Sequence, residues 1–289
     1  MKTIGETIKE IRIGKNLTRE DLASDTVSLS TIKRIENDAI NTSFINLQSI
    51  LHTLNIDFEE FNFIRNNYNL MDNEQLTYDF RKLTSVSVDS KEIEKLVPRY
   101  ERYLENHDDL EIANRLAFLK ALIVLNQTND LEKAASYVSH IWDNLEQLDN
   151  WYWADIQILS NIFFTFPIDT AQFIVELLLD KLDNYKTFKN ADRLYIALRI
   201  NYLQVLMLNH QFEKAYASID ATIELAKEKK FFLQWANAIG KKGILLHRLE
   251  MPGGEEYIAK AKRIWETLDE PKYIEDLDHD IELFLSKSQ

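Results

Sequence analysis

From about Leu76 to its end, the chain is a succession of segments whose apolar residues recur with the period of an α-helix. In the segment from Phe212 to Ala226, for example, the apolar positions form a single stripe along one face. Short polar stretches separate the segments, at residues 106–109, 126–130, 209–211 and 252–254. The pattern indicates amphipathic helices joined by tight turns.

The count of turn-forming residues points the same way. The 289 residues include only 6 glycines and 4 prolines, so turns are few, which argues against a β-sandwich or a glycine-rich α/β enzyme. With 45% hydrophobic and 11% aromatic residues, the chain has enough apolar surface to bury a core. We therefore predict an all-α protein.

A weak internal repeat organises the helical segments. Leu131-Glu132-Lys133-Ala134 and Phe212-Glu213-Lys214-Ala215 each open a segment, separated by two units of about 40 residues, and the segment through Tyr257 follows about one unit later. Two helices per unit with this period predict a stack of helical hairpins of the tetratricopeptide (TPR) kind, an α-solenoid. Because no copy matches the full consensus, a generic α-bundle stays open as an alternative.

The first 65 residues predict five short helices that form a separate domain. The first carries Ile4, Ile8 and Ile11 and ends near Gly14; the second starts at the N-cap Thr18, with Asp21 three residues on, and buries Leu22 and Ala23; the third is capped by Ser28, turns Ile32 and Ile35 inward and stops near Asn37-Asp38; Leu47 to Leu54 and Phe58 to Phe61 mark the other two. We expect an asparagine-rich linker at residues 66–73 and the repeat domain at residues 74–289.

The second and third predicted helices have the spacing of a helix-turn-helix, in which the third helix enters the major groove of DNA. Its exposed positions carry hydrogen-bonding or basic side chains, as a surface that reads bases requires; they are Ser30, Thr31, Lys33, Arg34 and Asn37. Arg12, Lys15 and Arg19 are predicted to contact phosphates. The alternative is an ordinary solvated helix face.

Net charge refines this prediction. The chain carries 47 acidic and 34 basic residues, a formal net charge of −13, which argues against nucleic acid binding over the whole surface. Residues 1–42, however, hold equal numbers of both signs, so all of the excess acid lies downstream. DNA contact is expected from the N-terminal helices alone.

Four segments of the N-terminal region carry a combined pattern: Ile4-Gly5-Glu6-Thr7-Ile8-Lys9-Glu10-Ile11-Arg12, Leu17-Thr18-Arg19-Glu20-Asp21-Leu22-Ala23, Ser30-Thr31-Ile32-Lys33-Arg34-Ile35-Glu36 and Asn55-Ile56-Asp57-Phe58-Glu59-Glu60-Phe61. Together these segments resemble a lambda-repressor-type helix-turn-helix. The turn from Ser24 to Leu29 departs from that pattern, because it lacks the usual glycine. Together with the repeats and the segment from Trp151 through Asn161, this departure makes the whole chain similar to the Rgg/MutR family of regulators.

The resemblance implies a cytoplasmic, homodimeric transcription regulator of the quorum-sensing type. Such a protein binds double-stranded DNA at an inverted-repeat operator, and its repeat domain binds a short, hydrophobic, imported signalling peptide on its concave face. Some members carry a cysteine that joins the two subunits; this chain has none, so that disulfide is excluded. Two other functions remain open: a helical-repeat scaffold whose N-terminal helices bind protein, and a DNA-binding regulator that responds to a protein or small molecule.

Three asparagines mark a candidate peptide site in the repeats. Asn161, Asn201 and Asn237 recur at nearly the repeat period, so they are predicted to face one groove, where an amide can both donate to and accept from a peptide backbone. Gln157 and Gln204 extend this row by one helical turn. Asn161 and Asn201 also match asparagines of the family, and Arg81 matches a family arginine, a partner for a peptide carboxylate. The alternatives are inter-helix hydrogen bonds for the asparagines and a local ion pair for Arg81.

Other chemistry finds little support in the sequence. The six histidines are scattered, and we find no His-Glu-x-x-His motif, phosphate-binding glycine loop or serine elbow, so we expect no catalytic residues, metal site or cofactor. No apolar run is long enough to span a bilayer. The aromatic residues Trp142, Trp151, Tyr152, Trp153, Phe163, Phe164 and Phe166 are expected to pack mainly in the core, with an apolar groove wall as the alternative.

Overall fold

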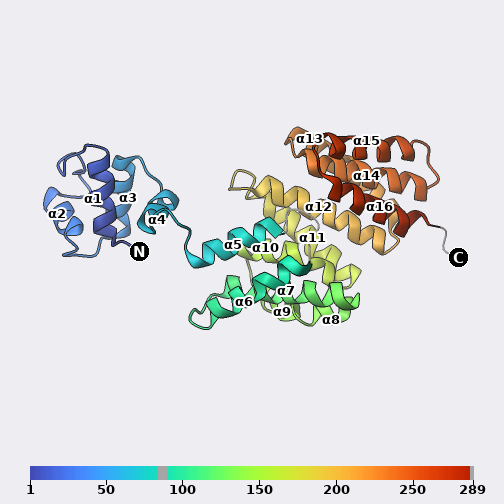
Figure 1. Ribbon diagram of the computed structural model, residues 1–289, viewed down its shortest axis with the longest axis horizontal. Coiled ribbons are helices and arrows are strands. Elements are labelled where there is room, and N and C mark those ends of the chain that lie inside the picture. The colour runs from blue at the N-terminus through green and yellow to red at the C-terminus, as the bar shows by residue number, and fades with distance from the viewer. Residues whose placement is uncertain (84–89, 287–289) are drawn as a thin grey trace. The chain divides into compact units, whose positions relative to one another are not determined.

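The computed structural model describes residues 1–83 and 90–286, and this part of the chain is helical, with no strand. The chain divides into two compact units, Met1–Tyr78 and Asp79–Gln289. Both are built from helices (Figure 1). The predicted all-α class is confirmed. The division falls inside a helix, α5, downstream of the linker expected at residues 66–73.

Four helices, rather than the expected five, make up the first 65 residues. They are α1 (Ile4–Gly14), α2 (Leu29–Glu36), α3 (Phe44–Leu54) and α4 (Phe58–Arg65), and α5 (Asp72–Leu83) follows. The helix ends near Gly14 and Asn37 are confirmed. The second predicted helix is wrong: residues 19–22 form turns, and Ala23, expected in the core, is exposed.

The expected capping interactions do form at Thr18, yet they start only one turn. The backbone N–H of Asp21 donates to Thr18 Oγ1 at 3.2 Å, and that of Thr18 donates to Asp21 Oδ2 at 2.7 Å. Ser24 then ends the turn, because its N–H donates forward to the carbonyl of Val27 at 3.0 Å. A continuing helix would need that N–H to reach a carbonyl four residues back.

The core of the first unit joins these helices around fully buried aliphatic side chains. Ile8, Leu22, Ile32, Ile50 and Leu54 are each 0% exposed. Leu22 therefore belongs to the core even though its helix is missing.

Helix α1 lies so close to α2 that residue 5 must be glycine. A Cβ at Gly5 would lie 2.1 Å from the carbonyl oxygen of Ile35, an atom of the α2 backbone that cannot rotate away. Replacing Gly5 by alanine is expected to lower the free energy of unfolding of this unit by about 1 to 3 kcal/mol. Urea unfolding followed through the amide NMR signals of α1 and α2 measures it. Gly14→Ala, at the other end of α1 with nothing within 4 Å, is the matched control; an equal loss in both variants would contradict the steric explanation.

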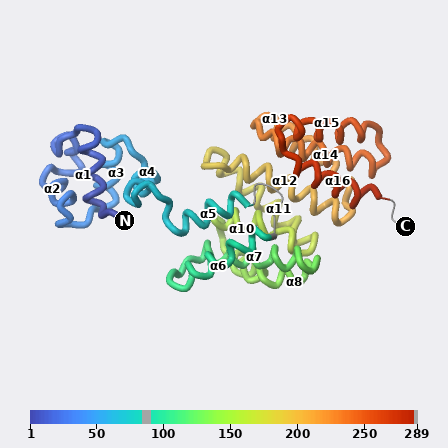
Figure 2. The backbone as a smooth tube through the Cα atoms, in the orientation of Figure 1, coloured from blue at the N-terminus to red at the C-terminus, as the bar shows by residue number. Residues whose placement is uncertain are grey.

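The second unit is a stack of helices (Figures 1 and 2). They are α6 (Ser90–Leu104), α7 (Leu110–Thr128), α8 (Leu131–Ala135), α9 (Ser139–Leu145), α10 (Trp153–Ile162), the 3-10 helix η1 (Phe163–Thr165), α11 (Ile168–Asp183), α12 (Ala191–Leu208), α13 (Phe212–Glu228), α14 (Phe232–Arg248), α15 (Gly254–Thr267) and α16 (Pro271–Leu285). The segment expected to open a full helix at Leu131 instead holds the short α8, separated by a turn from α9.

Contacts between helices define the layers of this unit. From α10 to α16, each helix packs against the next, and α10 also contacts α12, α12 contacts α14, and α14 contacts α16. The helices α10, α12, α14 and α16 therefore line up as one layer of the stacked hairpins, the arrangement that the repeat predicted. Residues at equivalent positions of these helices can then face the same side.

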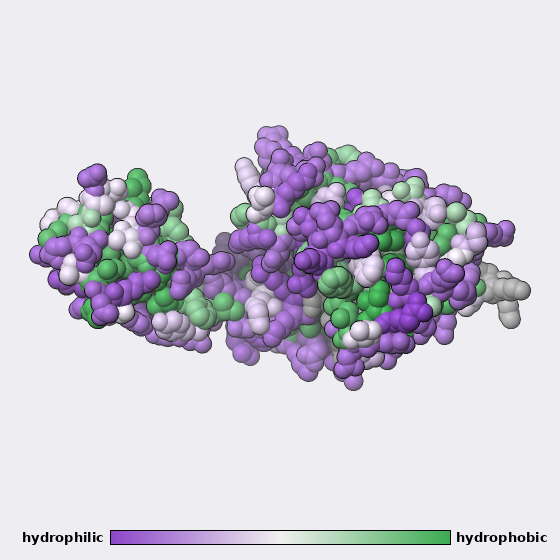
Figure 3. Space-filling view, turned by 90° about the horizontal axis from the view of Figure 1, so that it is seen from above, coloured by the Kyte–Doolittle hydropathy of each residue, from purple (hydrophilic) through white to green (hydrophobic). Residues whose placement is uncertain are grey.

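The surface and the helix lengths complete the fold. On the face shown in Figure 3, the surface is mainly hydrophilic, with smaller hydrophobic areas between. Within residues 1–83 and 90–286, no helix is both long and apolar enough to cross a membrane.

Candidate functional site

Helix α2 presents a polar, basic face. Its N-cap Ser28 accepts a hydrogen bond from the N–H of Thr31 at 3.2 Å, which starts the helix, and Ile32 and Ile35 anchor its inner side in the core. The predicted base-reading residues Ser30, Lys33, Arg34 and Asn37 are exposed, and Thr31 is half-buried. A rigid helix with hydrogen-bonding side chains on its outer face is suited to reading base edges in a groove.

A buried ion pair holds the C-terminal end of α2 against α1. The carboxylate of Glu36 accepts hydrogen bonds from Arg12 Nε at 2.5 Å, from Arg12 Nη2 at 3.0 Å and from Arg19 Nε at 2.7 Å. Arg12 Nη1 also donates to the carbonyl of Leu17 at 2.9 Å. Because the Glu36 side chain is 0% exposed, this carboxylate ties together α1, the turn after it and α2.

The ion pair changes the roles of two predicted phosphate contacts. Arg12 is buried, and contact with DNA would require it to give up its bonds to Glu36 and Leu17, so the structure gives it a positioning role instead. Arg19 shares the same carboxylate but is partly exposed. Lys15, at the end of α1, is exposed. Burial raises the pKa of Glu36, but hydrogen bonds from Arg12 and Arg19 outweigh it and hold the pKa below its usual value.

The repeat unit contains two adjoining cavities that share Phe80, Arg81, Gln157 and Asn161. The first, of about 250 Å³, is lined by Phe80, Arg81, Leu110, Glu111, Asn114, Arg115, Ala154, Asp155, Gln157, Ile158 and Asn161. The second, of about 210 Å³, is lined by Phe80, Arg81, Trp153, Gln157, Ser160, Asn161, Lys189, Asn190, Arg193, Leu194, Ala197, Leu198 and Asn201. Together they form one groove between helices α5, α7, α10 and α12, which we call the α10 groove.

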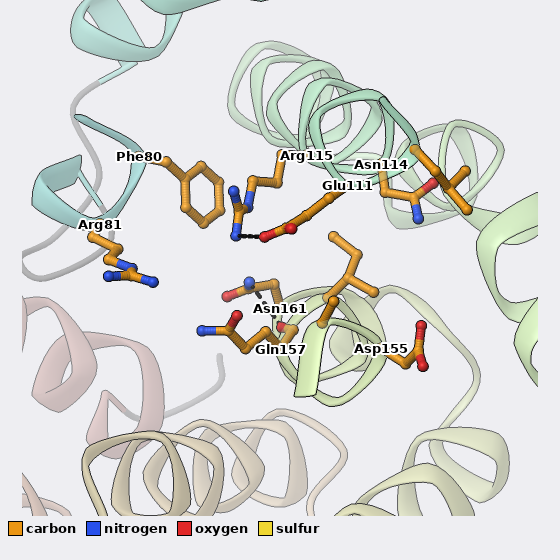
Figure 4. Close-up of a pocket in the computed structure, with 11 residues that line it drawn as sticks. Phe80, Arg81, Glu111, Asn114, Arg115, Asp155, Gln157 and Asn161 are labelled. Carbon is orange, nitrogen blue, oxygen red and sulfur yellow. Dashed lines mark hydrogen bonds and ion pairs between the residues drawn. The ribbon is translucent and has the colours of Figure 1, made fainter. Parts of the chain in front are cut away.

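Figure 4 shows the first cavity of the α10 groove. Arg81 reaches in from α5, while Gln157 and Asn161 extend from α10 into the same space. Arg115 lies over the Phe80 ring at 5.6 Å and pairs with Glu111 of its own helix. Asn161 Nδ2 donates to the carbonyl of Gln157 at 3.0 Å, which orients the amide. The cavity thus combines an aromatic wall with amide groups and charges of both signs.

Four of the six predicted peptide-binding residues come together in this groove. Arg81, Gln157, Asn161 and Asn201 line it, although they lie on three different helices. The approximate 40-residue spacing predicted that Asn161 and Asn201 face one groove, and both line it because α10 and α12 belong to one layer of helices. Their role in binding a peptide stays a prediction.

The other two predicted residues lie outside both cavities. Gln204 Nε2 donates to Asp280 Oδ1 at 2.9 Å, and its Oε1 accepts from Lys241, which also pairs with Asp280 at 2.9 Å. This cluster joins α12, α14 and α16, so Gln204 has an inter-helix role. Asn237 is half-buried on α14, and its Oδ1 has no hydrogen-bond partner among the described residues.

No sequence pattern indicated several of the residues that line the groove. Phe80, Glu111 and Arg115 carry no periodic signal that separates them from other amphipathic helix residues. Lys189, in the α11–α12 connection, and Arg193, in the first turn of α12, lie outside the asparagine spacing. Among the tryptophans, Trp151 is buried in the core, whereas Trp153 lines the groove. Among the described residues no three histidine or acidic side chains gather as a metal site would require.

Comparison with known protein families identifies the family to which the chain belongs. The chain matches the model for the C-terminal domain of the HTH-type transcriptional regulator Rgg over residues 94–278, which is more than half of its length, and a helix-turn-helix model over residues 8–61. The chain belongs to the Rgg family. It is accordingly a transcriptional regulator of the helix-turn-helix type, and the resemblance drawn from the sequence is confirmed.

Solved structures share the fold of this Rgg-family regulator along nearly its entire length. Bacillus thuringiensis PlcR, in a complex with the peptide PapR7 and DNA, is 19% identical with a TM-score of 0.71, over 96% of this chain and 99% of that one. The Streptococcus dysgalactiae SHP pheromone receptor Rgg2 is 19% identical with a TM-score of 0.72, over 96% and 98%. Streptococcus thermophilus ComR, solved with DNA and its signalling peptide ComS, is 14% identical with a TM-score of 0.63, over 96% and 98%.

Proposed function

We propose that this Rgg-family protein is a peptide-responsive transcription regulator of the quorum-sensing type, which binds operator DNA through α2 and a short signalling peptide in the α10 groove. One observation supports the proposed peptide binding. Four predicted residues from three helices line the same groove: Arg81, Gln157, Asn161 and Asn201. PlcR and ComR, which share the fold, were solved with both a peptide and DNA.

For the DNA half, the exposed side chains of α2 supply the base contacts. Lys33 and Arg34 reach the major groove together with Ser30, Thr31 and Asn37, while Lys15 and the exposed part of Arg19 contact phosphates. Glu36 and Arg12 fix α2 against α1, so the helix meets DNA as part of a rigid unit. Two copies of the chain, as a homodimer, read the half-sites of an inverted repeat. A regulator of this kind acts in the cytoplasm, where the DNA is, and needs no cofactor or catalytic step.

For the peptide half, the amides of Asn161 and Asn201 pair with the peptide backbone, and the apolar wall of the groove receives apolar side chains. Asn201 lies on α12, which packs onto α14 in the same layer of helices. A peptide that binds one arrangement of this layer more tightly than another shifts the population between them and so alters how the dimer holds DNA.

The double variant Asn161→Ala, Asn201→Ala tests the peptide site. Each amide offers a donor and an acceptor, so each truncation is expected to cost about tenfold in affinity, and both together about a hundredfold. A binder is first selected from a randomised pool of apolar octapeptides by affinity capture and mass spectrometry. Its affinity for both proteins is then measured by calorimetry.

The matched control removes two asparagines outside the groove, Asn126 of α7 and Asn144 of α9, both exposed. We expect Asn126→Ala, Asn144→Ala to bind the peptide as the parent protein does. Equal affinity of the groove variant and the parent protein would contradict the proposed site, and a pool without any binder would favour regulation by a protein or small molecule.

A further inference from the structure

The two cavities of the α10 groove differ in charge. In the first, the cations Arg81 and Arg115 lie with the acids Glu111 and Asp155. Among the described residues, the second is lined by three cationic side chains, Arg81, Lys189 and Arg193, and by no acidic one. This concentration of positive charge stands out in a chain with 47 acidic and 34 basic residues.

Aromatic rings hold one of these cations in place. Lys189 Nζ lies over the ring of Phe188, 5.5 Å from its centroid, and Phe188 packs edge-on against Trp153 at 5.3 Å. Trp153 itself lines the second cavity. The cation–π contact with Phe188 thus favours a position of the Lys189 ammonium group beside the second cavity.

Lys189 and Arg193 form no ion pair with any carboxylate in the part of the chain that the structure describes. The neighbouring Asp192 instead pairs with Lys229 at 3.1 Å. Both side chains, those of Lys189 and Arg193, are exposed, so an anion that enters the second cavity can reach their charges.

We propose that Lys189 and Arg193 form a carboxylate-binding subsite in the second cavity, so that the peptide bound by this regulator carries a carboxylate at that end. This inference rests on the proposed peptide binding in the α10 groove. Two chemical sources fit the subsite: the free C-terminus of the peptide and an acidic side chain. Leu194, Ala197 and Leu198 on the same helix offer apolar contacts to the residues between.

The spacing along α12 sets the place of that carboxylate in the peptide. Arg193 and Asn201 lie on the same helix and both line the second cavity. They are separated by slightly more than two turns, about 12 Å along the axis. An extended peptide covers this distance in about four residues. The carboxylate therefore belongs about four residues away from the peptide unit that Asn201 binds.

Three peptide pools test the subsite with the full-length protein. All have the same randomised apolar octapeptide sequences; one has a free C-terminal carboxylate, one has a C-terminal amide, and one has the amide plus a single aspartate. Affinity capture followed by mass spectrometry gives the enrichment of each pool. We expect at least one carboxylate-bearing pool to be enriched about tenfold over the uncharged amide pool, and the better of the two identifies the source of the carboxylate.

The double variant Lys189→Gln, Arg193→Gln is expected to lose this preference while still binding apolar peptides, because the asparagines remain. The control Lys186→Gln, Lys227→Gln removes the same charge at exposed positions outside both cavities and is expected to keep the preference. Equal enrichment of the three pools by the parent protein, or an unchanged preference in the groove variant, would overturn the subsite alone. Failure of every pool to bind would overturn the subsite together with the proposed peptide binding.

Discussion

Replacing Glu36 by glutamine is expected to lower the free energy of unfolding of the N-terminal unit by about 3 to 5 kcal/mol, the usual cost of breaking a buried ion pair on one side. Arg12 would keep its charge in a site where its side chain is only 11% exposed, without the carboxylate that accepts two of its hydrogen bonds. Glutamine has nearly the same shape, so the loss would come from charge and hydrogen bonding rather than from a cavity.

Urea unfolding followed through the amide NMR signals of α1 and α2 measures this loss. All five tryptophans lie between Trp142 and Trp265, so tryptophan fluorescence reports the repeat unit separately and is expected to keep its midpoint. Glu59→Gln, an exposed carboxylate of α4, is the matched control. A loss at Glu36 no larger than at Glu59 would contradict the role assigned to the ion pair.

The same ion pair predicts the pH dependence of the N-terminal unit. The pKa of Glu36 is lower in the folded protein than its ordinary value of about 4.3. A carboxyl group of this kind stabilises the fold fully above the ordinary pKa, and the stabilisation is lost as the pH falls through the lowered one. The stability difference between the parent protein and Glu36→Gln should therefore be largest near neutral pH and shrink in acid. A difference that is constant with pH would contradict this assignment.

Replacing Arg34 by alanine is expected to weaken operator binding by about 5- to 150-fold, corresponding to about 1 to 3 kcal/mol for a residue that contacts a base. Arg34 lies on the exposed side of α2 and forms no ion pair with the residues that the structure describes, so its removal leaves the core of the unit intact. Arg34→Ala therefore tests the base contact without lowering the stability of the unit, whereas Glu36→Gln is expected to lower that stability.

Fluorescence anisotropy with a duplex selected from a randomised pool measures this affinity over a range of salt concentrations. Lys133→Ala, on the exposed surface of α8, removes the same charge from the repeat unit and is expected to change affinity little. If Arg34→Ala and Lys133→Ala bound the selected duplex equally, α2 would not be the reading helix. Absence of any DNA affinity at low salt would instead favour the scaffold function.

Local patterns predicted most of the architecture correctly, because helix periodicity and capping depend on neighbouring residues. The capping box at Thr18 shows the limit of such patterns: its hydrogen bonds form, but the forward bond of Ser24 to Val27 ends the helix after one turn. The repeat spacing likewise found Asn161 and Asn201, since equivalent positions on α10 and α12 face one groove. It did not place Asn237 in either cavity.

The sequence by itself determined the helical class and the resemblance to a helix-turn-helix regulator, and it indicated two of the asparagines that line the groove. Only the tertiary structure decided which polar side chains are already engaged within the protein. Arg12 has the sequence character of a phosphate contact, yet it is bound to Glu36 of another helix, and Gln204 is bound to Lys241 and Asp280. The same folding leaves Lys189 and Arg193 beside a cavity that no acidic side chain of the described residues lines. The physical reason is that a charged group or an amide forms hydrogen bonds only with partners within about 3 Å. Folding brings those partners from residues that are distant in the sequence.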